Sequence, residues 1–74
     1  MKKKILNYLI NRGYVVNHIE KIAEYQNSNI YSPSLFDKDG MALPIGLPVL
    51  VLERTGKFSI VEGDDALSLL DKIK

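Results

Sequence analysis

Apolar residues gather in two short runs in the second half of the chain. The first run is Val49–Leu52, and the second comprises Phe58, Ile60 and Val61. Thr55-Gly56, between them, is typical of a tight hairpin turn. Pro48 precedes the first run, a position at which a strand tolerates proline because a strand start needs no ladder donor. The pattern predicts a β-hairpin with Pro48 at its entry.

Helical spacing marks both ends of the chain. Near the start, apolar residues recur at i, i+1, i+4 and i+5: Ile5, Leu6, Leu9 and Ile10. This spacing predicts a helix over residues 2–12, which Gly13 stops. Near the end, a second apolar stripe follows Gly63-Asp64-Asp65: Ala66, Leu67, Leu70 and Ile73. Acidic residues in a first turn suit the positive end of the helix dipole, so a second helix is expected there.

The middle of the chain gives a less regular pattern. Residues 14–19 are β-branched and aromatic and predict a strand, whereas residues 20–27 are rich in helix formers and predict a helix. Ser32-Pro33-Ser34 is expected to begin a short helical turn with Leu35 and Phe36 on its buried side. Residues 37–40, Asp-Lys-Asp-Gly, predict a turn. The predicted order is therefore α-β-α-β-β-α.

Three segments in this order resemble the glutaredoxins, which have the thioredoxin-like fold. Residues 4–16 (KILNYLINRGYVV) are similar to the family's redox helix and the strand after it. Leu47-Pro48-Val49 resembles the signature in which the proline is cis, and residues 58–70 (FSIVEGDDALSLL) resemble the last strand, turn and helix. The resemblance implies a small α/β domain in which Leu47-Pro48 meets a peptide backbone. It also implies that the turn at residues 63–65 holds the γ-glutamyl end of glutathione.

The chain departs from this family at the redox centre. Glutaredoxins begin with a strand that leads into a Cys-x-x-Cys or Cys-x-x-Ser motif, and this sequence contains no cysteine. We therefore expect residues 1–74 to form a single thioredoxin-like domain that is truncated at its N-terminus and redox-inactive. The missing strand would expose a sheet edge at residues 14–19 or 47–52, which another strand could cover.

Composition restricts the function further. Of 74 residues, 46% are hydrophobic and 26% are charged, and the formal net charge is +1. Such a balance gives no electrostatic argument for nucleic acid. The absence of cysteine excludes a disulfide, a thiol nucleophile and a thiolate metal site. No stretch approaches the roughly 18 apolar residues of a membrane span, and we expect a cytoplasmic protein.

The candidate binding residues form two groups. Leu47, Pro48 and Val49 are expected to provide a partner-binding edge, although Pro48 also suits a strand entry with no binding role. Gly63, Asp64 and Asp65 are expected to bind a partner, although Asp is also a preferred helix-capping residue and capping alone accounts for it. His18, the single histidine, has no further ligands at metal-site spacing.

These observations predict a non-catalytic protein-binding module that acts on a protein partner or by self-association. No enzyme activity, cofactor or metal is expected, and neither is a small-molecule ligand, a nucleic acid or a membrane. One alternative is a small nucleic-acid-binding regulatory protein that uses Lys2–Lys4 in a reduced helix-turn-helix. Another is a glutathione-binding protein without thiol chemistry.

Overall fold

The computed structural model describes residues 2–44 and 48–73. A helix stands at each end of this part of the chain, and five strands lie between the helices. In chain order the elements are α1 (Lys2–Asn11), β1 (His18–Tyr25), β2 (Ser28–Phe36), β3 (Ala42–Leu43), β4 (Val49–Arg54), β5 (Lys57–Glu62) and α2 (Asp64–Ile73).

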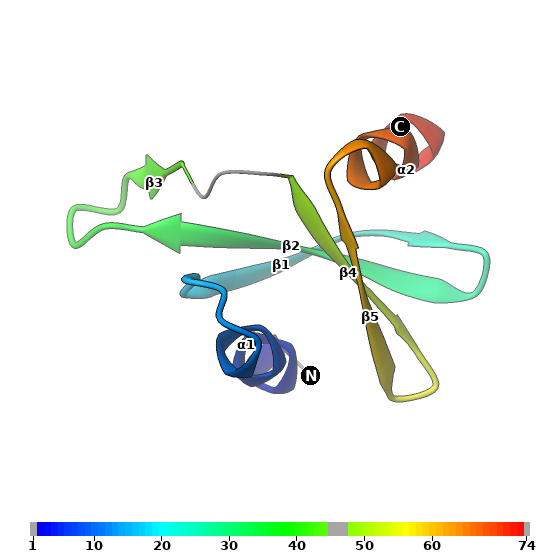
Figure 1. The fold of residues 1–74 in the computed structure, drawn as a ribbon, viewed down its shortest axis with the longest axis horizontal. Coiled ribbons are helices and arrows are strands. Elements are labelled where there is room, and N and C mark those ends of the chain that lie inside the picture. The colour runs from blue at the N-terminus through cyan, green and yellow to red at the C-terminus, as the bar shows by residue number, and fades with distance from the viewer. Residues whose placement is uncertain (1, 45–47, 74) are drawn as a thin grey trace.

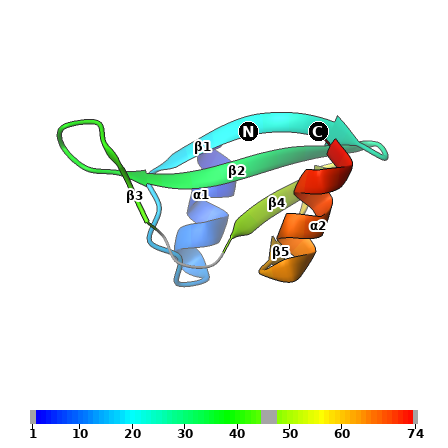
Figure 2. The same ribbon diagram turned by 90° about the horizontal axis from the view of Figure 1, so that it is seen from above.

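The strands form one antiparallel sheet with a helix on each face (Figure 1). The strand order is β1-β2-β4-β5, and the short β3 pairs with the C-terminal end of β2. In Figure 2 the β2–β3 hairpin projects away from the two helices. Because each helix covers one face, the protein has two small hydrophobic cores rather than one.

The two cores meet at β4, whose side chains alternate between them. Val51 belongs to the core under α1, together with Ile5 and Leu9. Leu50 belongs to the core under α2, together with Ala66. The continuous apolar run of β4 is thereby explained, since a strand covered on both faces has no polar side.

The predicted thioredoxin-like fold is wrong. Every strand pair described is antiparallel, and the third element along the chain, β2, is a strand where the resemblance requires a helix. The α-β-α-β-β-α order is therefore replaced by α-β-β-β-β-β-α. The expectation of a glutaredoxin-like domain lacking its first strand falls with it.

The helix predicted over residues 20–27 is wrong because strand pairing overrides local helix propensity. These residues form most of β1 and the turn after it, and the strand predicted over residues 14–19 begins only at His18. A bulge between Lys21 and Ala23 also hides the strand pattern, because the extra residue, Ile22, reverses the alternation. As a result Ile19 packs under α1 and Tyr25 packs under α2.

The helical turn predicted at Ser32-Pro33-Ser34 is also wrong, since these residues lie inside β2. Leu35 and Phe36 pair with β3 and are half-buried. The turn at residues 37–40 is confirmed, where the Gly40 amide donates to the Asp37 carbonyl over 3.0 Å.

The β4–β5 hairpin and both terminal helices are confirmed. Thr55 and Gly56 have φ angles of 51° and 82°, which are the positive values that a two-residue type I′ turn requires. The same geometry recurs at Gln26 and Asn27, with φ of 50° and 66°, where the sequence carries no glycine. That second turn was missed because only asparagine there favours a positive φ.

Deletion of Ile22 tests the role of the bulge. On either side of the bulge, Lys21 pairs with Tyr31 and Ala23 pairs with Ile30, and these partners are neighbours in β2. Removal of Ile22 therefore leaves a regular ladder in which every side chain of β1 keeps its present face of the sheet. We expect the variant to fold and to unfold cooperatively in urea. Deletion of Ser59 from the bulge-free β5 is the matched control, because it moves residues on one side of the deletion to the wrong face. A misfolded Ile22 variant would contradict this account.

Candidate functional site

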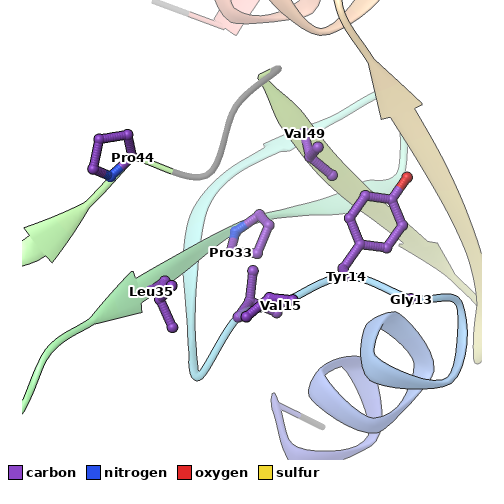
Figure 3. Close-up of a pocket in the computed structure, with 8 residues that line it drawn as sticks. Gly13, Tyr14, Val15, Pro33, Leu35, Pro44 and Val49 are labelled. Atoms are coloured by element: carbon purple, nitrogen blue, oxygen red, sulfur yellow. The ribbon is translucent and has the colours of Figure 1, made fainter.

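A cleft opens where β2 and β4 separate. Its volume is about 340 Å³, and slightly more than half of its lining is apolar. The lining residues are Gly13, Tyr14, Val15, Val16, Pro33, Leu35, Pro44 and Val49. Figure 3 shows side chains from the α1–β1 connection, from β2 and from the start of β4 arranged around this space. The cleft thus combines segments that are distant in the sequence.

Pro33 explains why the cleft forms at this place. The β2–β4 ladder ends at the pair Tyr31–Val51, and the next hydrogen-bonded pair in this register would join Pro33 to Val49. Proline has no amide hydrogen and cannot donate to that ladder. The two strands diverge at this point, and Pro33 and Val49 line opposite sides of the cleft.

The structure brings together described members of both predicted binding groups. The Gly63 amide donates to the Pro48 carbonyl over 2.9 Å, and Val49 pairs with Glu62 across the hairpin. Val49 also lines the cleft. Leu47 and the geometry of its bond to Pro48 lie outside the described residues.

Asp64 and Asp65 occupy the exposed first turn of α2, immediately after this junction. The Leu67 amide donates to the Gly63 carbonyl over 3.1 Å, so Gly63 begins the hydrogen-bonding pattern of the helix. Both carboxylates suit the positive helix end and remain accessible to a partner. Glu62, which pairs with Val49, and these two aspartates, which follow it closely in the chain, are called the acidic group.

Tyr14 supplies a hydroxyl group at the cleft. The neighbouring Glu62 carboxylate and, to a smaller extent, desolvation raise the pKa of Tyr14 above its ordinary value of 10.0. The hydroxyl is therefore protonated at neutral pH. Arg12 opposes this shift, and its guanidinium also lies 4.4 Å from the centre of the Tyr8 ring.

The other candidate residues lie elsewhere. Lys2, Lys3 and Lys4 are exposed on α1, and the element after α1 is a strand, so the second helix that a helix-turn-helix requires is not formed there. The His18 ring lies edge-on to Phe36 with 5.1 Å between ring centres. Within residues 2–44 and 48–73, no three acidic or histidine side chains are grouped as metal ligands would be. No helix in the same segments is long and apolar enough to cross a membrane.

Sequence reasoning missed Val15, Pro33, Leu35 and Pro44 as site residues. The available signal was Pro33 within the β-branched and aromatic stretch at residues 30–36, since a proline there indicates an interrupted ladder. Comparisons of the chain with protein-family models, with curated proteins and with solved structures found no match. The glutathione-binding expectation therefore loses the family resemblance on which it depended.

Proposed function

We propose that this protein is a non-catalytic protein-binding module that receives an apolar side chain of a partner in the Pro33–Val49 cleft. The observation that carries the proposal is the cleft itself, whose lining side chains offer hydrocarbon and one hydroxyl. The one side-chain hydroxyl among the lining residues is that of Tyr14, and its raised pKa disfavours the phenolate that a nucleophile would require. Apolar contact inside a polar rim is instead typical of protein recognition.

Exposed apolar residues extend this surface beyond the cleft. Val15, which lines the cleft, is 73% exposed. Met41 and Leu43, on the projecting β2–β3 hairpin, are also exposed large apolar residues. Monomeric proteins seldom leave several such side chains in one region without an interaction that covers them.

The charge beside the cleft defines the partner further. Glu62, Asp64 and Asp65 are all exposed, and Val49 lies directly across from Glu62. A basic residue next to the partner's apolar anchor would pair with this acidic group, which favours association and orientation. We therefore propose a partner segment with an apolar anchor flanked by lysine or arginine.

Selection of a displayed random-peptide library against the whole chain tests this proposal. We expect the selected peptides to share an apolar position beside a basic one. Val15→Asp should weaken their binding roughly tenfold, because it places a charge in the contact surface. Val15 is outside the buried core, so the variant should keep its fold.

Leu67→Asp is the matched control, because Leu67 is 50% exposed on α2 and does not line the cleft. This variant should bind the selected peptides as the native chain does. Peptides without a shared apolar position would overturn the proposal, as would peptides that bind the Val15 variant with native affinity.

A further inference from the structure

Along the strand order β1-β2-β4-β5, the two outer strands β1 and β5 differ in how well they are protected. β1 carries a bulge between Lys21 and Ala23 and charged residues along its length. The Lys21 ammonium and the Glu24 carboxylate lie 2.8 Å apart. Bulges and charges are devices that prevent an outer strand from pairing with another chain.

β5 has a regular edge. All six of its residues pair with β4, without a register shift and without proline. Arg54 and Lys57 close the two-residue turn, so they form a hydrogen-bonded pair, and hydrogen-bonded and non-hydrogen-bonded pairs alternate from there. The backbone groups of Phe58, Ile60 and Glu62 consequently point away from β4.

Two hydrogen bonds agree with this direction. The Tyr8 hydroxyl of α1 donates to the Phe58 carbonyl over 3.4 Å, which agrees with a carbonyl that points away from β4. At the other end of β5, the Gly63 amide donates to the Pro48 carbonyl. This bond falls where the alternation of the ladder predicts the next hydrogen-bonded pair after Leu50–Val61. Among the described residues, no backbone hydrogen bond to another element engages the outward groups of Ile60.

We propose that β5 pairs antiparallel with β5 of a second copy of this chain, with the two-fold axis at Ile60. The amide and carbonyl of Ile60 then bond to the same residue of the second copy. Phe58 likewise bonds to Glu62 of that copy. A carbonyl oxygen has two lone pairs, so Phe58 can accept from the second copy while the Tyr8 hydroxyl remains bound.

The distribution of charge along β5 favours this orientation. Lys57 lies at the start of the strand, and Glu62 and Asp64 lie at and just beyond its end. Antiparallel pairing about Ile60 places each Lys57 opposite Gly63 of the second copy, so the basic start of one strand lies beside the acidic end of the other. Parallel pairing would instead bring the two lysines together, and like charges at opposing positions are destabilising.

The decisive experiment uses the whole chain made by chemical synthesis, with the Ile60 amide N-methylated. Methylation removes only an outward donor, since the β4–β5 ladder does not use this amide. We expect the unmodified chain to form dimers in sedimentation equilibrium over a concentration series. The dissociation constant of the methylated chain should be about tenfold higher or more, because two symmetry-related hydrogen bonds are lost.

N-methylation at Glu24 is the matched control. Its pair with Asn29 is non-hydrogen-bonded, so its amide also points outward, but on the protected β1 edge. This chain should dimerise as the unmodified chain does, and circular dichroism should show the same fold for all three. A monomeric unmodified chain would overturn the proposal. The proposal would also be overturned if the chain methylated at Ile60 had the same dissociation constant as the unmodified chain. The same holds if methylation at Glu24 raised the dissociation constant as much as methylation at Ile60.

Discussion

Leu9→Ala should lower the free energy of unfolding by about 3 kcal/mol, which is the usual cost of truncating a buried leucine. The Leu9 side chain is fully buried in the core that joins α1 to the sheet. The Leu9 carbonyl also accepts from the amides of Arg12 and Tyr14, so this residue lies where α1 ends. A domain of this size has a total stability near the low end of about 5–15 kcal/mol, so most of it would be lost.

Urea unfolding of the variant and the native chain measures this loss directly. The control is Ile10→Ala at the next position, where the side chain is 50% exposed. Its effect should stay within about 0.5 kcal/mol, as is usual for surface substitutions. Equal destabilisation by the two substitutions would show that α1 does not pack on the sheet through Leu9.

Glu53→Gln should make stability less dependent on pH below neutrality. The Glu53 carboxylate accepts a hydrogen bond from the Asn29 side-chain amide over 2.7 Å and another from the Gly56 backbone amide over 2.8 Å. These bonds, the one from Asn29 first, lower the pKa of Glu53 from its ordinary value of 4.5. The carboxylate thus joins β2 to the turn between β4 and β5.

The sign of the effect follows from the lowered pKa. At pH values above 4.5, Glu53 is ionised in both states, and its contribution to stability is fully present. As pH falls through the lower pKa of the folded state, the folded carboxylate takes up a proton and this contribution disappears. The native chain should therefore lose more stability than Glu53→Gln when both are unfolded in urea at decreasing pH.

Glu24→Gln is the control for this pH series. Lys21 lowers the pKa of Glu24 also, but the Glu24 side chain is 71% exposed. Exposed ion pairs contribute little because solvent screens them. The pH dependence of this variant should stay close to that of the native chain, and a flattening as large as that of Glu53→Gln would contradict the assignment.

The candidate site was only partly predictable from the sequence. Pro48, Val49 and Gly63 were selected from local patterns, and the structure brings them together through the Gly63–Pro48 hydrogen bond. Val15 and Pro33 were not selected, because their relation to Val49 depends on which strands are neighbours in the sheet. Strand order is a non-local property that no short segment encodes.

The sequence by itself determined the elements whose signals are local. Apolar spacing and the stop at Gly13 fixed α1, the acidic first turn and apolar stripe fixed α2, and Thr55-Gly56 fixed the β4–β5 hairpin. Only the tertiary structure decided that residues 18–25 form a strand. Their helix propensity is weak beside the hydrogen bonds and burial gained by pairing with β2, and the bulge at Ile22 conceals the alternation that would reveal the strand.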